Sequence, residues 1–559
     1  MKDKIKVFAL GGLDERGKNI YVVEKNDDIF IIDGGMKYPE KTMPGIDFII
    51  PNIDYLVENR HRIVGIIASH AHDDMIGSLP YIIKKLQVPV YTSKITAYFI
   101  KDAARRHQVD TGDIDFRYVE GNEEKDINGN KVYFFTTTHS VAQSFGVAID
   151  SDQGLIVYTG DYIFDFSASN KFSFDISFMS QIANKGVLLM LGESDGSDHS
   201  GHTSPKHRLT PLIEPYFVDT ESRIFISQFT QSLFGINEII ELALKYNRKV
   251  LFYSREMQRH ISVIRELGII NIPDNMLVSH DYLANENNKD VCVIFTGIGE
   301  RIYRVLKKVA DGEKNKNMFV QPDDLIIIAT ATVPGCEIEA ASASDAIFRT
   351  GAKVVTISRK QVASMHASRE DIKMMLKIFN PKYYMPVKGE FRQLLANAQL
   401  AVDLNMGYNH QNVIVYDNGM IAQFENGKKI EKYPVPTVPV GDVFVDGLGV
   451  GDIGSGVLVD RQRLSDNGVV ILGATVDKKT GIMVAGPDIQ IRGLVYLRDA
   501  EDLVKDITKT FVEILTLEIK DPYYILEDLE KKIRDRISYK IRKSTGKDPL
   551  IIPAIVELN

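Results

Sequence analysis

The sequence contains no tryptophan, only two cysteines and no long apolar run. Cys292 and Cys336 are too few for a disulfide framework and lack the Cys-x-x-Cys spacing of thiolate metal sites. We therefore expect both cysteines to be reduced and any metal to be held by histidine and carboxylate. No stretch reaches the roughly 18 apolar residues of a membrane span, and the apolar run at residues 7–10 is too short for a signal peptide. These absences predict a cytoplasmic protein with no membrane partner.

The composition is that of an ordinary globular protein. The chain has 559 residues, of which 44% are hydrophobic and 25% are charged, enough for three or four domains with substantial cores. Its formal net charge of −8 argues against nucleic-acid binding through overall charge. A local basic channel remains compatible with that net charge.

The stretch at residues 63–86 has the pattern of a strand, a polar turn and a helix. Its turn contains His70, His72 and Asp74, and its apolar residues change from a β-prone run to helical spacing across that turn. The two imidazoles lie on the same side of an extended turn, so they and the carboxylate can converge on one cation. We interpret the stretch as a metal site. The alternative is a polar turn that happens to contain two histidines.

Three further polar residues follow predicted strands. The strand at 131–136 delivers His139, which either completes a three-histidine site or is a structural histidine. The strand at 154–159 ends just before Asp161, a carboxylate that either bridges two cations or shapes a turn. Asp33 either orients the histidine turn or caps backbone N–H groups.

The histidine turn resembles the His-x-His-x-Asp-His signature of the metallo-β-lactamase fold, in which the Asp-His pair binds a second metal. Met75 stands at the last position of that signature. Longer segments resemble bacterial ribonuclease J, of the nucleic-acid-directed β-CASP group: residues 9–21, 44–47, 138–140 and 446–452. The resemblance covers nearly the whole chain. It implies an α/β fold, a metallo-β-lactamase αββα sandwich with an inserted β-CASP α/β domain and a C-terminal α/β domain.

The strand and helix patterns allow for this organisation. We expect a first part of the metallo-β-lactamase domain at 1–205, a β-CASP domain at 206–350, a return segment at 351–433, a linker at 434–450 and a C-terminal domain at 451–559. Within the C-terminal domain we expect strands at 457–459, 469–473 and 482–485 and helices at 500–520 and 530–543.

The resemblance also implies roles for particular residues. It implies metal binding by His70, His72, His139 and Asp161, catalytic roles for Asp74, Asp195 and His366, and contacts to substrate phosphate by Ser364, His366, Ala367 and Ser368. The serine-rich turn at 364–368 opens a predicted helix, whose N-terminus offers backbone N–H groups to an anion. A capping or core histidine is the alternative for His366.

Two positions depart from the active family. Met75 replaces one ligand of the second metal, and Lys388 replaces the histidine of the family's Pro-Val-His-Gly-Glu segment. A thioether is a poor ligand for a hard divalent ion, and a protonated lysine has no lone pair to donate. Two unit charges about 4 Å apart repel by about 4 kcal/mol at an effective dielectric constant of about 20, and a divalent ion doubles this energy. We expect an empty second site, in which the lysine ammonium near Asp74 and Asp161 replaces the charge of the ion.

These observations predict a ribonuclease J-like protein of the degenerate, second-paralogue kind, acting in RNA processing and decay. We expect an RNA-binding subunit with weak or absent 5′-3′ exoribonuclease or endoribonuclease activity and one Zn²⁺ or Mn²⁺ ion per chain. The expected partners are single-stranded RNA, preferably with a 5′-monophosphate end, and other subunits, in a homo-oligomer or with an active paralogue. Two alternatives stay open: a self-sufficient ribonuclease that uses one ion, and a metal-free structural scaffold.

Overall fold

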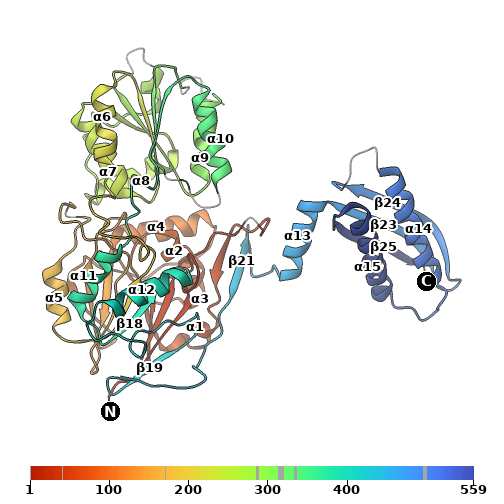
Figure 1. Cartoon of the computed structure of the whole chain (residues 1–559), viewed down its shortest axis with the longest axis horizontal. Coiled ribbons are helices and arrows are strands. Elements are labelled where there is room, and N and C mark those ends of the chain that lie inside the picture. The colour runs from red at the N-terminus through yellow and green to blue at the C-terminus, as the bar shows by residue number, and fades with distance from the viewer. Residues whose placement is uncertain are drawn as a thin grey trace. The chain divides into compact units, whose positions relative to one another are not determined.

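The structure, a computed structural model, describes residues 2–558 except residues 41, 170, 285–288, 313–319, 331, 333–335 and 495–499. The chain forms two compact units (Figure 1). The first unit comprises Met1–Tyr38 and Ile49–Val443, and the second comprises Pro39–Phe48 and Phe444–Asn559. No helix in the described part of the chain is both long enough and apolar enough to cross a membrane.

The first unit contains two mixed sheets. The larger has the strand order β20-β19-β1-β2-β3-β5-β6-β7, and the smaller has the order β18-β12-β11-β10-β9-β8. The strands of the larger sheet are β1 (Ile5–Gly11), β2 (Ile20–Lys25), β3 (Asp28–Ile32), β5 (Ile63–Ala68), β6 (Val90–Thr92), β7 (Phe116–Tyr118), β19 (Ala422–Glu425) and β20 (Lys428–Lys429). Those of the smaller sheet are β8 (Glu123–Ile127), β9 (Asn130–Thr136), β10 (Phe145–Ile149), β11 (Leu155–Tyr158), β12 (Val187–Glu193) and β18 (Tyr383–Val387).

Side chains alternate between two cores along these strands. In β1, Val7 packs with Phe134 of the other sheet, whereas its neighbour Phe8 belongs to the core beneath the helices. Helices on the larger sheet are α1 (Asp54–Glu58), α3 (Leu79–Leu86) and α4 (Lys94–Arg106), and those on the smaller sheet are α5 (Ile176–Ala183), α11 (Arg369–Phe379) and α12 (Phe391–Asp403). This layering is an αββα sandwich, which confirms the predicted fold class.

An inserted segment (residues 210–356) interrupts the smaller sheet between β12 and β18. It forms an all-parallel sheet of order β14-β15-β13-β16-β17, in which β13, β15 and β16 are almost wholly buried. Its strands are β13 (Ile224–Phe229), β14 (Lys249–Phe252), β15 (Val291–Gly297), β16 (Leu325–Ile328) and β17 (Lys353–Thr356). One face packs against α6 (Thr210–Asp219), α7 (Leu233–Lys245) and α8 (Arg255–Glu266), and the other against α9 (Arg301–Ala310) and α10 (Glu337–Phe348).

The chain returns from the inserted segment through α11 to β18. Strand β18 pairs in parallel with β12, with Tyr383 opposite Leu189. This pairing places the residues after β18 beside those that end β12. The remaining short elements of the chain are β4 (Phe48–Pro51), α2 (Asp73–Ile76), β21 (Asp442–Asp446), β22 (Gly449–Val450) and the 3₁₀ turns η1 (Arg60–Arg62) and η2 (His280–Ala284).

The second unit carries a three-stranded sheet of order β24-β23-β25. Its elements are α13 (Ser455–Asn467), β23 (Val469–Asp477), β24 (Ile482–Arg492), α14 (Ala500–Glu518), α15 (Leu526–Thr545) and β25 (Leu550–Leu558). Residues 457–459 lie in α13, so the strand predicted there is wrong. Three apolar residues are too few to distinguish the period of a helix from the period of a strand. The other two predicted strands and both predicted helices are confirmed.

Candidate metal centre

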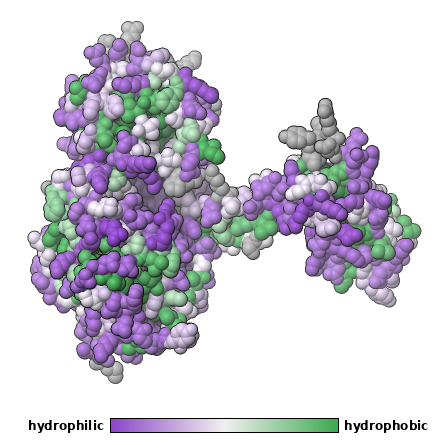
Figure 2. Space-filling model, in the orientation of Figure 1, coloured by the Kyte–Doolittle hydropathy of each residue, from purple (hydrophilic) through white to green (hydrophobic). Residues whose placement is uncertain are grey.

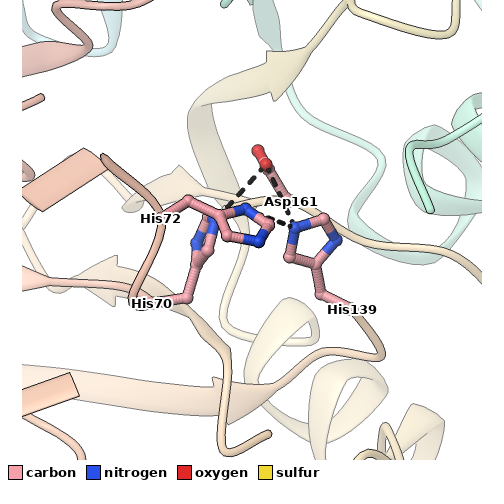
Figure 3. Close-up of side chains that lie close together, drawn as sticks. All are labelled: His70, His72, His139 and Asp161. Atoms are coloured by element: carbon pink, nitrogen blue, oxygen red, sulfur yellow. Dashed lines mark hydrogen bonds and ion pairs between the residues drawn. The ribbon is translucent and has the colours of Figure 1, made fainter. Parts of the chain in front are cut away.

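Three strand ends bring four of the predicted site residues together. His70 and His72 follow β5, His139 follows β9 and Asp161 follows β11. Since β5 belongs to one sheet and the other two strands to its partner, the cluster forms at a shared edge of the sandwich. Figure 3 shows the three imidazole rings turned towards one another, with the Asp161 carboxylate beside them.

The donor atoms of this cluster lie within 4.8 Å of one another, and four of their separations are close to those of a tetrahedral metal site. His72 Nδ1 lies 3.2 Å from His70 Nε2 and 3.1 Å from His139 Nε2. Asp161 Oδ2 lies 3.4 Å from His70 Nε2 and 3.6 Å from His139 Nε2. Metal–ligand bonds of about 2.0–2.1 Å place neighbouring donors of a tetrahedral site about 3.3 Å apart. The four groups therefore fit a single divalent ion.

Hydrogen bonds on the outer ring nitrogens turn the inner lone pairs towards the centre. His139 Nδ1 donates to the Met365 carbonyl at 2.7 Å, and because a carbonyl only accepts, Nε2 of the neutral ring carries no proton. His70 Nδ1 donates to Ser69 Oγ at 3.0 Å, since the serine hydroxyl gives its own proton to Asp33 Oδ2. Asp33 also accepts from the Ser69 backbone N–H at 2.7 Å, so it orients the histidine turn.

Burial keeps the imidazoles of His72 and His139 neutral. Burial, together with the neighbouring His70, lowers the pKa of His72 to about 3. The same two causes lower the pKa of His139 well below its usual range. Neutral imidazole is the form that binds a metal. Three imidazoles and a carboxylate suit Zn²⁺, and they are compatible with Mn²⁺.

Lys388 reaches the same carboxylate oxygen of Asp161, Oδ2, that faces the imidazoles of His70 and His139. Its ammonium forms an ion pair with Asp161 and lies 3.1 Å from Asp74 Oδ2, and its side chain is only 8% exposed. Burial alone lowers the pKa of this lysine, but Asp161 and Asp74 outweigh burial and raise its pKa well above the usual value. The lysine is therefore charged and has no lone pair to offer to a cation.

Met75 is fully buried. It belongs to the core beneath the helices, and its sulfur lies 3.8 Å from the hydroxyl of Tyr158. Because that hydroxyl is hydrogen-bonded to Asp33 at 2.8 Å, the thioether packs against the support of the histidine turn. The structure gives Met75 a packing role at this position.

His366 is held between two carboxylates next to the cluster. Its Nδ1 lies 2.8 Å from Glu193 Oε2, and its Nε2 lies 3.4 Å from Asp195 Oδ2. Burial lowers the pKa of His366, but the two carboxylates outweigh it and raise the pKa to about 9. Sequence reasoning singled out Asp195 and missed Glu193. The available signal was its place as a carboxylate at the end of the buried strand β12.

Two of the residues predicted to contact substrate phosphate use their backbone N–H groups within the chain. The Ala367 backbone N–H donates to Glu193 at 3.0 Å, and the Ser368 N–H donates to Asp371 at 3.1 Å, where it helps to cap α11. Both N–H groups are therefore engaged within the chain. The exposed Ser364 lines the cavity described below, as do His366 and Ser368, and contacts of the predicted set with phosphate stay a prediction.

A cavity of about 1010 Å³ opens onto these residues. One wall includes His72, Asp74 and His139, and the facing wall includes Gln231 and Ser232 of the inserted segment. Figure 2 shows mainly hydrophilic side chains where the inserted segment meets the rest of the first unit. The cavity is large enough for several groups of a polymeric substrate.

Four segments of the chain match known families. Residues 13–204 match the metallo-beta-lactamase superfamily, and residues 221–347 match the ribonuclease J beta-CASP domain. Residues 353–413 match the Zn-dependent metallo-hydrolase RNA specificity domain, and residues 456–558 match the ribonuclease J C-terminal domain.

Individual proteins resemble the chain along most of its length. Ribonuclease J 2 of Staphylococcus aureus (strain MRSA252) and that of Staphylococcus epidermidis (strain ATCC 35984) are each 32% identical to it over 562 residues, covering 99% of this chain and 98% of the relative. A crystal structure of a protein of unknown function from Enterococcus faecalis V583 resembles 75% of this chain and 100% of that chain, with a TM-score of 0.52 and 15% identity. The last likeness concerns the fold alone.

The donor geometry predicts one tightly held ion per chain. After loading with Zn²⁺ or Mn²⁺ and dialysis, we expect one ion per chain by elemental analysis. His72→Ala removes a donor and is expected to lower the affinity by about 100-fold or more, measured by competition with a chelator. His199→Ala is the matched control, because the imidazole of His199 pairs only with Asp198 among the described residues. Two retained ions per chain would contradict the assignment.

Proposed function

The chain belongs to the ribonuclease J family, and we propose that it binds single-stranded RNA in the cavity beside its metal centre. It hydrolyses the RNA slowly, from a 5′-monophosphorylated end, with one Zn²⁺ or Mn²⁺ ion. In RNA processing and decay it serves as an RNA-binding subunit beside a fully active paralogue. Homology supports the ribonuclease family, and the charges described below support the finer statements.

The observation that carries the proposal is the distribution of charge around the cavity. Among the exposed cations that line it, Lys206, Arg359 and Lys360 have no ion-pair partner among the residues that the structure describes, whereas Arg16 pairs with Glu390. Cationic side chains along a groove attract the phosphate backbone of a single strand. They lie in the same cavity as the proposed ligands, so a strand held by them passes the metal centre. The net charge of −8 is therefore no obstacle, because the positive charge is local.

The residues around the cavity supply the elements of phosphodiester hydrolysis. A divalent ion held by His70, His72, His139 and Asp161 supplies a Lewis acid that lowers the pKa of a bound water. His366 lines the cavity and is hydrogen-bonded to Glu193, with Asp195 at its other nitrogen. Both carboxylates favour its protonated form, so it can give a proton to the leaving oxygen. Asp74 acts indirectly, by holding the ammonium of Lys388.

Lys388 accounts for the slow turnover. A two-metal hydrolase holds its ions about 3.5–4 Å apart and uses both to clamp the attacked phosphate. The Lys388 ammonium lies against Oδ2 of Asp161 and Oδ2 of Asp74, and it supplies one positive charge there without a site for water. Part of the clamp is missing, whereas the groups that bind RNA are retained.

We assign a separate task to each part of the chain. The sandwich holds the ion, the inserted segment forms the facing wall for RNA, and the C-terminal domain supports assembly into a homo-oligomer or with the active paralogue. The predicted domain boundaries, 1–205, 206–350, 351–433 and 451–559 with a linker at 434–450, remain our proposal for this division.

The central test is degradation of a 5′-monophosphorylated single-stranded RNA by the purified chain with added Mn²⁺ or Zn²⁺. We expect slow shortening from the 5′ end, abolished in His72→Ala and retained in a His410→Ala control, because His410 is exposed and lies outside the cavity wall. Products resolved on a sequencing gel distinguish end-directed from internal cleavage. Activity that survives in His72→Ala would count against the metal centre, because that variant lacks one of its donors.

Restoring the two replaced ligands is expected to restore the second ion. In Met75→His/Lys388→His the repelling ammonium is removed and two neutral imidazoles are added. We expect two ions per chain by elemental analysis and RNA turnover faster by a factor on the order of 100. Lys388→Ala, which removes the charge and adds no ligand, is the matched control. A double variant that still holds one ion would show that other residues exclude the second.

Assembly with an active paralogue is tested by mixing. We expect the chain and an active ribonuclease J from the same cell to elute together in size-exclusion chromatography. The mixture should degrade RNA faster than the active protein alone at low RNA concentration, because the chain adds binding sites. Separate elution at micromolar concentrations would refute the subunit role.

A further inference from the structure

Tyr38 is an exposed aromatic side chain in the wall of the cavity. It is 52% exposed, whereas Phe234, another aromatic residue of the same wall, is 5% exposed and packs against Phe172. Tyr38 belongs to none of the buried core clusters formed by the described residues, and its ring meets no other aromatic ring among them. The ring therefore contributes little to the folded core and leaves much of its surface free.

The position of this ring is nevertheless set by a strong anchor. The hydroxyl of Tyr38 donates to Asp73 Oδ2 at 2.8 Å, and Asp73 is 5% exposed. Asp73 stands in the chain between His72 and Asp74. A hydrogen bond from a phenol to a buried carboxylate is charge-assisted, which makes it stronger than a neutral one. The ring is thereby tied to the turn that carries the metal ligands.

Asp73 is itself braced from two other elements. Gln231 of the inserted segment donates from Nε2 to Asp73 Oδ1 at 3.0 Å. Arg106 of α4 lies 3.7 Å from the same oxygen and also pairs with Asp102 at 3.0 Å. The anchor of Tyr38 thus touches both walls of the cavity. An aromatic ring fixed in this way loses little conformational entropy when a ligand covers it.

We propose that Tyr38 is a stacking site for one nucleobase of the bound RNA strand, next to the metal centre. The inference rests on the proposed function, because the ligand is the same RNA. Every base presents a π-face, so a fixed aromatic ring accepts any of the four bases. Since Asp73 adjoins His72, the stacked base belongs to a nucleotide close to the bond that is cleaved. Such a contact holds the strand at the metal centre and does not select its sequence.

The test measures RNA binding without cleavage. Fluorescence anisotropy is recorded in EDTA with a labelled, 5′-monophosphorylated single-stranded RNA, for the full chain and for Tyr38→Ala and Tyr38→Phe. We expect Tyr38→Ala to weaken binding by about 5- to 150-fold, the range for one stacked base. Tyr38→Phe keeps the ring and loses the anchor, so we expect a smaller loss. Tyr433→Ala is the control, because Tyr433 is fully exposed and lies outside the cavity wall.

A set of oligonucleotides that each lack one base identifies the stacked nucleotide. At one position, removal of the base should weaken binding to the wild-type chain and have little further effect on Tyr38→Ala. The inference would be overturned if, at every position, the loss of affinity on removal of the base added to the loss caused by Tyr38→Ala. Equal binding by the wild type and Tyr38→Ala would also overturn it. The inference would also be overturned if Tyr38→Phe bound RNA as weakly as Tyr38→Ala and, in a separate elemental analysis after metal loading, both variants had lost the metal. Tyr38 would then be a structural brace.

The failure of the proposed function gives a different pattern. If the cavity does not bind RNA, the wild-type chain shows no binding and Arg359→Glu/Lys360→Glu changes nothing. If only the stacking site is wrong, the wild type and Tyr38→Ala bind equally well and Arg359→Glu/Lys360→Glu still weakens binding. The thermal unfolding of Tyr38→Ala serves as a check that the variant is folded.

Discussion

The charge of Asp161 is the constraint on which the rest of the site depends. One oxygen of its carboxylate, Oδ2, faces the imidazoles of His70 and His139 and also the ammonium of Lys388. Burial alone raises the pKa of Asp161, but Lys388 and His70 hold it well below its usual value. A buried carboxylate of this kind needs positive charge around it. Lys388 provides part of that positive charge permanently. A cation bound by the donor cluster would provide the remainder.

The fold brings these charges together over long distances in the sequence. Lys388 follows β18, which is added to the smaller sheet only after the inserted segment has been completed. Its backbone has a φ of 57°, a left-handed conformation that is unfavourable for lysine. The ion pairs to Asp161 and Asp74 favour this placement of the side chain. A second ion would have to compete with an ammonium that is already bound in place.

The inserted segment supports the metal centre as well as facing it. The Phe234 backbone N–H donates to the Ser140 carbonyl at 2.9 Å, and Ser140 Oγ lies 3.0 Å from His72 Nε2. Gln231 reaches Asp73 from the same segment. Direct hydrogen bonds therefore fix the position of the inserted segment relative to the histidine turn. This arrangement couples the wall formed by the inserted segment to the turn that carries the histidine cluster.

Several features of the protein followed from the sequence by itself. The family and the sandwich with its insertion were predicted and are confirmed, because strand periodicity and motif spacing are local properties of the chain. The same motifs named the four donors that the structure brings within 4.8 Å of one another. Their role as ligands, and that of Asp195 and His366 in catalysis, stays a prediction.

Other features were decided only by the tertiary structure. The partner of His366 is Glu193, which approaches it through the parallel pairing of β12 with β18 and the packing of α11, and no local pattern encodes that approach. The N–H groups of Ala367 and Ser368 are bound to carboxylates that lie elsewhere in the chain or in the next helix. Residue types and spacings thus determined which groups are available. Which of them meet, and which are already satisfied, depended on contacts between segments far apart in the sequence, and those contacts exist only once the sheets have packed.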